Sequence, residues 1–236
     1  MKPVYKRILL KLSGEGLMGD KGFGVDAKIA AALAAEIAEV RDLGVQICLV
    51  IGGGNFFRGA KNATEGMDRS VADQVGMMAT LMNALVMKTA IERAGCPVEI
   101  FSGLVMPQVC ETYSFREAVK SLAKGKVVIF AAGTGNPYFT TDSGAALRAA
   151  EMHCDVIMKA TQVNGVYDSD PRFNPDAKRY ETISFAEVEE KKLKVMDMTA
   201  ITMAAENNIP IMVFAQKGKN SIVEAVCGLA ECTIIK

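Results

Sequence analysis

The sequence predicts an α/β protein, a three-layer αβα sandwich in which a mainly parallel central sheet is covered by helices on both faces. Two observations favour this class. Short apolar runs rich in β-branched residues alternate with segments whose apolar residues recur at helical spacing, which is typical of βαβ connections. Most of these runs are apolar nearly throughout, as expected for strands that helices bury on both faces.

Seven runs are predicted to form the strands. They begin at residues 7, 45, 96, 126, 155, 209 and 232 and read RILLKLS, VQICLVIGGG, CPVEIFSG, KVVIFAAG, DVIMKAT, IPIMVFAQ and CTIIK. Between the first two runs, apolar residues at positions 29, 33, 37 and 40 predict a helix from Asp26 to Leu43. Asp26 is its candidate N-cap and Gly44 its stop, so the chain opens with a βαβ unit.

A second helix is predicted from Arg69 to Ala94. No charged residue lies between Asp73 and Lys88, and one apolar stripe is formed by Val71, Val75, Met78, Met82 and Leu85. A helix that is apolar on more than one side needs a second surface to cover it. We expect this helix to pack against another subunit; the pattern leaves burial within one chain open as the alternative.

Length and charge limit the function classes. The 236 residues are predicted to form a single domain, residues 1–236, since no linker, repeat or low-complexity tract interrupts them. The formal net charge is zero, and no basic stripe suited to a nucleic-acid backbone is present. The least regular segment, residues 161–184, reads as a long loop of the kind that is functional or disordered.

The six cysteines and the apolar runs bear on localisation. None of the cysteines forms a CxxC pair, and most lie within or beside apolar segments, which predicts reduced core thiols in a cytoplasmic protein. No apolar run approaches the roughly 18 residues of a membrane span, so no membrane partner is expected.

Four glycine- or threonine-rich stretches follow predicted strands: KLSGEG (11–16), GGGNFFRG (52–59), GTGNPYFTTD (133–142) and KATQVNGVYDSDP (159–171). Parallel strands place such loops at one edge of the sheet, where ligands bind. Glycines let backbone amides approach phosphate oxygens, and Lys11, Arg58 and Lys159 are the nearest cations. The stretches therefore predict a site that binds phosphates, although any one of these lysines by itself would read as a solvated residue at a strand end.

Other chemistries find little support. The only histidine, His153, stands at a predicted helix end and is interpreted as structural, which leaves Ser/His and Cys/His catalysis without a base. No HExxH, EF-hand or GxxxxGK[ST] pattern occurs. The GFGVDA stretch at residues 22–27 fits a loose dinucleotide pattern but follows a polar loop instead of a strand, so we discount it.

Two acidic residues have open interpretations. Asp142 is either an ordinary helix N-cap or a buried carboxylate that holds Lys11 and Lys159 in place. Asp73 is either an acidic residue in the first turn of its helix or a ligand-binding group.

With these four loops in order, the chain resembles the amino acid kinase superfamily and, within it, the bacterial-type UMP kinase (uridylate kinase) branch. The stretches KLSGE and GVYDSDP recur across the superfamily, whereas GGGNFFRG together with GTGNPYFTTD is specific to that branch. The resemblance covers essentially the whole chain and implies ATP-dependent phosphorylation of UMP to UDP in pyrimidine nucleotide (CTP) biosynthesis. Departures are small: Gln162, Asn164 and Tyr138 replace Lys, Asp and Phe of many relatives.

The resemblance also implies roles for individual residues. It assigns catalysis to Lys11, Arg58, Asp142 and Lys159. It implies that ATP is bound by Lys11, Leu12, Ser13, Gly14, Gly54, Arg58, Thr161, Tyr167 and Asp170. It implies that UMP is bound by Gly53, Asp73, Thr134, Gly135, Asn136, Pro137, Tyr138, Phe139, Thr140 and Thr141.

Regulation and assembly follow from the same resemblance. The GDKGFG segment matches a part linked in relatives to activation by GTP, and it consists of Gly19, Asp20, Lys21, Gly22, Phe23 and Gly24. Relatives further imply Mg²⁺ held through the nucleotide phosphates, feedback inhibition by UTP, and a homohexamer.

The absence of a candidate general base agrees with this activity. A phosphate monoester has its second pKa near ~6, so a UMP phosphate oxygen is already an anionic nucleophile at neutral pH. Two other functions stay open: a different amino acid kinase acting on a small acid, and a uridine-nucleotide sensor without catalysis.

Overall fold

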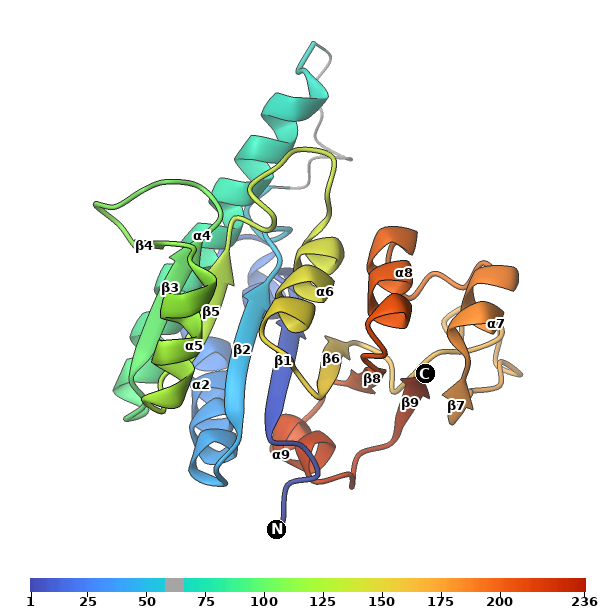
Figure 1. Ribbon diagram of the computed structural model, residues 1–236. Helices are drawn as coiled ribbons and strands as arrows, with labels where there is room; N and C mark the ends of the chain where they lie inside the picture. Colours follow the sequence, from blue (N-terminus) through green and yellow to red (C-terminus); the bar gives the residue numbers. More distant parts are fainter. Residues whose placement is uncertain (58–65) are drawn as a thin grey trace.

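The computed structural model describes residues 1–57 and 66–236, and its centre is a nine-stranded sheet in the order β4-β3-β5-β2-β1-β6-β8-β9-β7 (Figure 1). The seven predicted strands are present as β1 (Arg7–Leu12), β2 (Gln46–Ile51), β3 (Val98–Ser102), β5 (Val127–Ala131), β6 (Val156–Thr161), β8 (Ile211–Ala215) and β9 (Cys232–Ile235). Sequence reasoning misses β4 (Glu111–Thr112) and β7 (Thr182–Ile183), because a two-residue strand carries no periodicity.

The strands pair in parallel, apart from β8 and β9, which pair antiparallel. Strands β5, β2, β1 and β6 are consecutive neighbours in the sheet. Because parallel strands end at the same edge, the four predicted loops that follow them share that edge. The prediction of a mainly parallel sheet is confirmed.

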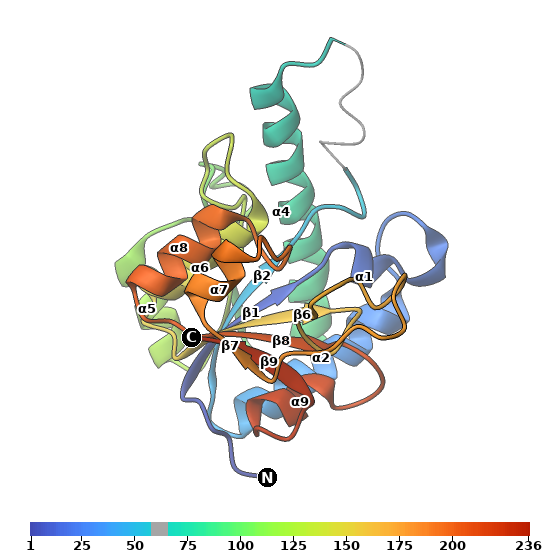
Figure 2. The ribbon, with the colours of Figure 1, turned by 90° about the vertical axis from the view of Figure 1, so that its right-hand side faces the viewer.

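Helices cover both faces of the sheet, and the prediction of a three-layer sandwich is confirmed (Figures 1 and 2). One buried cluster joins the sheet to α2 (Ala27–Asp42), α4 (Arg69–Arg93) and α9 (Ser221–Val226). The opposite cluster joins it to α5 (Phe115–Ala123), α6 (Thr141–Glu151), α7 (Phe185–Glu190) and α8 (Met198–Glu206). Along β1, Ile8 and Leu10 enter the first cluster and Leu9 enters the second, as the two-residue period of a strand requires.

Both predicted helices form where expected. Asp26 caps α2 by accepting hydrogen bonds from the N–H groups of Lys28 and Ile29. Gly44 follows the helix with a φ of +88°, a conformation that glycine adopts without steric cost. Helix α4 matches its predicted bounds to within one residue.

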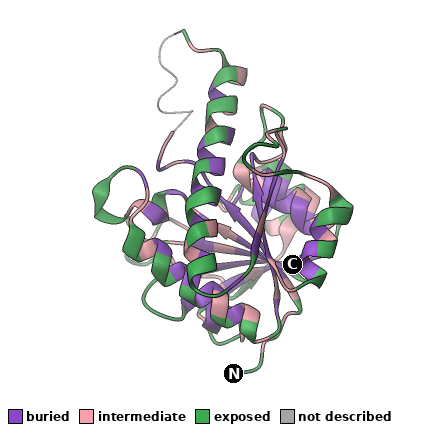
Figure 3. Cartoon of the chain, turned by 90° about the vertical axis from the view of Figure 1, so that its left-hand side faces the viewer, coloured by how far each residue is buried: buried purple, intermediate pink, exposed green. Residues whose placement is uncertain are grey.

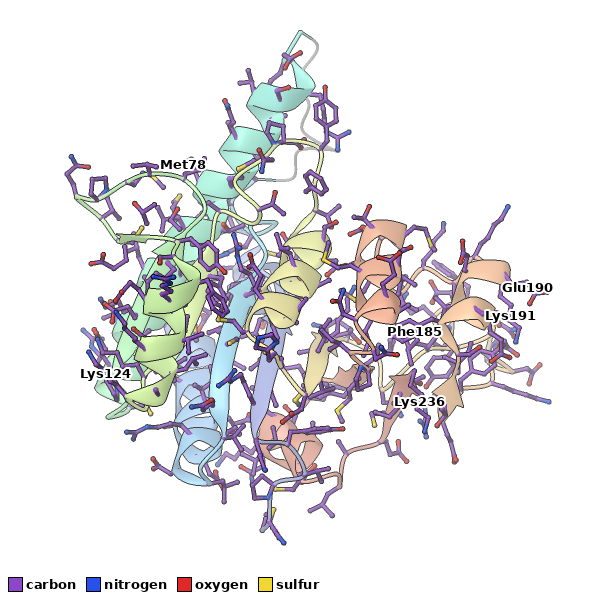
Figure 4. The ribbon with its side chains drawn as sticks, in the orientation of Figure 1. Met78, Lys124, Phe185, Glu190, Lys191 and Lys236 are labelled. Atoms are coloured by element: carbon purple, nitrogen blue, oxygen red, sulfur yellow. The ribbon has the colours of Figure 1, made fainter. Side chains whose placement is uncertain are left out.

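One face of α4 is exposed (Figure 3). The side chains of the predicted apolar stripe, including Met78 labelled in Figure 4, are between 37% and 47% exposed. The opposite face is buried through residues that include Met77, Leu81, Ala84 and Met87. Burial of the whole helix within one chain is therefore wrong, and the apolar stripe is left free to contact another surface.

The cysteines, His153 and the length of the apolar helices bear on three further expectations. All six cysteines lie in described segments and are free thiols. The ring of His153 packs edge-on against Phe115, with 6.4 Å between ring centroids, which agrees with a structural role. Across residues 1–57 and 66–236, we find no helix with the length and apolar character needed to cross a membrane.

Candidate active site

Two lysines lie side by side at the carboxyl ends of neighbouring strands. Lys11 of β1 and Lys159 of β6 are direct register partners, so their side chains leave the same face of the sheet. Asp142, in the first turn of α6, places Oδ1 2.9 Å from Nζ of Lys11 and Oδ2 2.9 Å from Nζ of Lys159. Lys159 donates a hydrogen bond to Oδ2, whereas the Lys11 contact has ion-pair distance without hydrogen-bond geometry. We call these three residues the ion cluster.

The ion cluster shifts the protonation of two of its members. Burial by itself would raise the pKa of Asp142, but the charges of Lys11 and Lys159 outweigh it, so the net pKa is lowered. Burial lowers the pKa of Lys159 and the Lys11 charge adds to this effect, while Asp142 opposes it. The outcomes differ because two cations act on Asp142 and overcome its burial, whereas burial and the Lys11 charge together outweigh the effect of Asp142 and Asp197 on Lys159. With both lysines protonated, the ion cluster carries excess positive charge toward a bound anion.

Thr140, and not Asp142, is the N-cap of α6. The Thr140 Oγ1 accepts hydrogen bonds from the N–H groups of Asp142 and Ser143. The interpretation of Asp142 as a helix cap is therefore wrong, and the structure agrees with a carboxylate buried between two lysines. Asp197, the N-cap of α8, accepts hydrogen bonds from the hydroxyls of Thr140 and Ser143. Sequence reasoning misses Asp197, since nothing local links it to a residue so far away in the chain.

The two glycine loops after β1 and β2 touch. A Cβ on Gly14 would lie 2.3 Å from the carbonyl oxygen of Gly52 and 2.5 Å from Oδ1 of Asn55, so only glycine fits there. Beneath this contact, Asn55 and Asn83 of α4 form a buried, reciprocal amide pair with distances of 2.9 and 2.7 Å. Asn83 also donates to the carbonyl of Gly52 at 2.6 Å, which ties the second loop to α4.

A cavity of about 610 Å³ lies beside the loop after β2, between α4 and the segment that joins β5 to α6. Eight of the residues predicted to bind UMP or ATP line it, namely Gly53, Gly54, Asp73, Thr134, Asn136, Phe139, Thr140 and Thr141. Thr80 and Ala132 also line it and are missed by sequence reasoning. We call this space the acceptor cavity.

Three residues predicted to contact UMP do not line the acceptor cavity: Gly135, Pro137 and Tyr138. Gly135 packs instead against Gly103, where a Cβ would lie 2.5 Å from the Gly103 carbonyl oxygen. The backbone N–H of Tyr138 donates to Oδ2 of Asp73 at 2.8 Å, and its ring is exposed. Asp73 lies beyond the first turn of α4, so a simple first-turn acid does not describe it.

Two further cavities, of about 570 and 520 Å³, share Lys159, Thr161 and Gln162. Residues predicted to bind ATP line them: Tyr167 and Asp170 the larger, Lys11 and Ser13 the smaller. We call them the donor cavities. The first half of the long loop predicted at residues 161–184, as far as Arg172, thus lines the larger of them.

Charged side chains of both signs line the larger donor cavity. Asp170 accepts two hydrogen bonds from the guanidinium of Arg172, and these contacts lower the pKa of its carboxyl to about 2. Lys191, labelled in Figure 4, also lines this cavity, together with Lys192 and Lys194. Sequence reasoning misses these three lysines because they stand in an ordinary charged stretch between helices.

The other predicted site residues are Arg58, Leu12 and the segment of residues 19–24. Arg58 lies outside the described residues. The side chain of Leu12 is buried in the core, so only its backbone can face a ligand. In the predicted GTP segment, Phe23 packs edge-on against Phe56, and Gly24 exchanges hydrogen bonds with Asn55. This segment therefore contacts the loop after β2.

Acidic, histidine and cysteine side chains are scattered over the described part of the chain. Within the described part of the chain, no three His, Cys, Asp or Glu side chains converge to hold an ion. The Asp142 carboxylate is already neutralised by two ammonium groups.

Comparison with known proteins identifies the family. The sequence profile described as "Amino acid kinase family" matches residues 6–215. The chain belongs to the amino acid kinase family. Within it, the chain is 52% identical to the uridylate kinase of Erythrobacter litoralis over 234 residues, covering 99% of this chain and 98% of that one. It is 51% identical to the uridylate kinase of Paramagnetospirillum magneticum, covering 98% and 96% of the two chains.

Solved structures of this amino acid kinase branch show the same fold. The UMP kinase of Ureaplasma parvum superposes with a TM-score of 0.94 at 38% identity and full coverage of both chains. The UMP kinase of Bacillus anthracis gives 0.93 at 35% identity, covering 98% of this chain and 96% of that chain. The chain is therefore a member of the uridylate kinase branch of the family.

Proposed function

We propose that this chain transfers the γ-phosphoryl group of ATP to UMP, producing ADP and UDP. The observation that carries the proposal is the position of the ion cluster. Lys11 and Lys159 line the donor cavities, and Asp142 directly follows Thr141, which lines the acceptor cavity. Positive charge thus stands between a space suited to one nucleotide and a space suited to the other. The names of the relatives support uridylate as the acceptor.

The transfer is proposed to be direct and in line, without a general base. A phosphate oxygen of UMP attacks the γ-phosphorus, the bond to the β–γ bridging oxygen breaks, and ADP leaves with that electron pair. Since the second phosphate pKa of UMP is near ~6, the attacking oxygen needs no proton removed at neutral pH. The protein's task is then to position two polyanions and to offset the charge on the moving group.

The ion cluster performs the second part of that task. Lys11 and Lys159 would contact the phosphoryl oxygens, and Asp142 holds both ammonium groups in a fixed place before substrate arrives. Backbone N–H groups of the loops around Gly14 and Gly53 would supply further donors. Arg58 is proposed to add a cation from outside the described residues.

Magnesium is proposed to enter with ATP as part of the substrate. Magnesium normally keeps several waters and binds phosphate oxygens with few protein ligands, which fits a site without an acidic cluster among the described residues. No step of the reaction needs a metal ligand from this chain.

We also propose the assembly and regulation that the family resemblance implies. The exposed apolar stripe of α4 supports a subunit interface and a homohexamer as the assembled form. Activation by GTP through residues 19–24 is supported by their contacts with the loop after β2. Feedback inhibition by UTP, a cytoplasmic location, a single domain and a place in pyrimidine nucleotide (CTP) biosynthesis complete the proposal.

A coupled assay for ADP release tests the activity. The purified chain with MgATP should release ADP much faster with UMP than with CMP, glutamate, aspartate or carbamate. Equal rates for UMP and these acceptors would overturn the proposal. If ADP release is absent but UMP still raises the melting temperature, the chain is a uridine-nucleotide sensor instead.

A further inference from the structure

The chain leaves β5 for the acceptor cavity through an unusual backbone conformation. Ala132 has a φ of +59°, in the left-handed region that residues with a Cβ avoid, and it is fully buried. Such a conformation persists only where surrounding contacts hold it. The carbonyl of Ala132 accepts a hydrogen bond from the N–H of Gly135 at 2.9 Å, which closes a tight turn at the start of the cavity wall.

The contact that holds Ala132 comes from α4. The Thr80 hydroxyl accepts the backbone N–H of Ala132 at 2.8 Å and donates its own proton to the carbonyl of Met77 at 2.7 Å. Thr80 and Ala132 are both buried at the wall of the acceptor cavity, and each provides the other with a hydrogen-bond partner there. Because the single hydroxyl proton is used within the helix, the lone pairs of Oγ1 are directed to the Ala132 amide.

A second contact from the same helix holds the other end of this wall. Tyr138 also has a left-handed backbone, with a φ of +72°, and donates its N–H to Asp73. Asp73 and Thr80 are seven residues apart, about two helical turns, and therefore lie on one side of α4. Between these two anchors, Thr134 and Asn136 line the acceptor cavity.

We propose that Thr80 is a positioning residue for the acceptor nucleotide. Its hydroxyl sets the conformation of Ala132, and Ala132 sets where the cavity wall from residue 133 to residue 138 begins. The chemical role of Thr80 is thus to preorganise the acceptor cavity through the backbone, without taking part in phosphoryl transfer. This inference rests on the proposed function, since it assumes that the acceptor cavity binds UMP.

The test compares three variants of Thr80 with a matched control. Thr80→Val keeps the shape of the side chain and removes the acceptor oxygen, whereas Thr80→Ser keeps the hydroxyl. Thr89→Val is the control, because Thr89 lies on the same helix and makes the same kind of bond, to the carbonyl of Leu85, away from the cavity. Thr80→Ala removes both the hydroxyl and the γ-methyl group, adds no bulk, and serves if Thr80→Val does not fold.

Steady-state kinetics give the first readout. Loss of positioning should raise the KM for UMP about tenfold in Thr80→Val, while the KM for ATP and the kcat change by less than about threefold. Thr80→Ser and Thr89→Val should stay near the wild-type values. Equal KM values for UMP in Thr80→Val and Thr89→Val would overturn the inference.

Hydrogen exchange of the ligand-free protein gives the second readout. The Ala132 amide should exchange faster in Thr80→Val than in Thr80→Ser, because its partner is removed before any ligand binds. Unchanged exchange with a raised KM would mean that Thr80 touches UMP directly, and the positioning role would be wrong. A wild-type chain that phosphorylates no UMP would instead overturn the proposed function itself.

Discussion

Neutralising Asp142 is the sharpest test of the ion cluster. The Asp142→Asn change keeps the shape of the side chain and removes the charge that two ammonium groups share at 2.9 Å each. At an effective dielectric constant of about 20, each pair interacts by roughly 6 kcal/mol before desolvation is subtracted. Breaking a buried pair by removing one partner costs about 3–5 kcal/mol, because the remaining charges stay buried and uncompensated.

The kinetic effect should be nearly as large. If the carboxylate orients both lysines toward the transition state, kcat should fall about 10²–10³-fold, which corresponds to about 2.7–4 kcal/mol. The KM for UMP should change little, since Asp142 does not line the acceptor cavity. Initial rates of ADP release at saturating substrates measure both constants.

The control for this experiment is Asp42→Asn. Asp42 ends α2, its side chain is 70% exposed, and it pairs only with its neighbour Arg41 at the surface among the contacts described. Its removal should leave kcat unchanged. Turnover of a folded Asp142→Asn variant within about threefold of the wild type would refute the role given to the ion cluster.

A pH profile adds a signature that general destabilisation would not produce. The charge of Asp142 raises the pKa of Lys159 against the effect of burial. Without that charge, Lys159 loses its proton at lower pH, so the alkaline decline of kcat should move to lower pH in Asp142→Asn. An alkaline limb at the wild-type position would mean that Lys159 is not the group titrating there.

Three further predictions concern protonation, loop contact and assembly. For the wild type, kcat/KM for UMP should fall about tenfold per pH unit below ~6, because the attacking phosphate of UMP takes up a proton there. The lowered pKa of Asp142 keeps its carboxylate ionised over this range, so a single acid limb near pH ~4 would contradict this prediction. Gly14→Ala should abolish turnover, because the new Cβ would lie 2.3 Å from the carbonyl oxygen of Gly52. Gly16→Ala should be tolerated, because the nearest atom to its Cβ, Oε1 of Gln216, would be 3.8 Å away; equal activities of the two variants would contradict the loop contact. Met78→Glu should lower the mass measured by light scattering without loss of helix content, because it places a charge in the exposed apolar stripe; an unchanged mass would exclude α4 from the interface.

Much of the fold is predictable because each strand carries its own signal. The runs beginning at Arg7 and Val45 are apolar enough to read as buried strands without any knowledge of their neighbours. Helix α4 and its apolar stripe are predictable in the same way, but only the structure shows that the stripe is exposed. The two-residue strands β4 and β7 are not, because only pairing with a neighbour makes them strands.

The site was predictable in its parts and not in its arrangement. Asp197, Asn83 and Thr80 escape sequence reasoning because each looks like an ordinary residue of its own helix. Their importance comes from partners distant in the chain: Thr140 and Ser143 for Asp197, Gly52 and Asn55 for Asn83, and Ala132 for Thr80.

The sequence by itself determined seven of the strands, the helices of residues 26–43 and 69–94, and the edge at which four loops meet, since these follow from local apolar patterns and glycine placement. Only the tertiary structure decided that Lys11 stands opposite Lys159, that Thr140 takes the cap of α6, and that Asp142 is thereby released to lie between the lysines. The physical reason is competition: strand register and helix capping each have several locally acceptable solutions, and the packing of distant segments selects one of them.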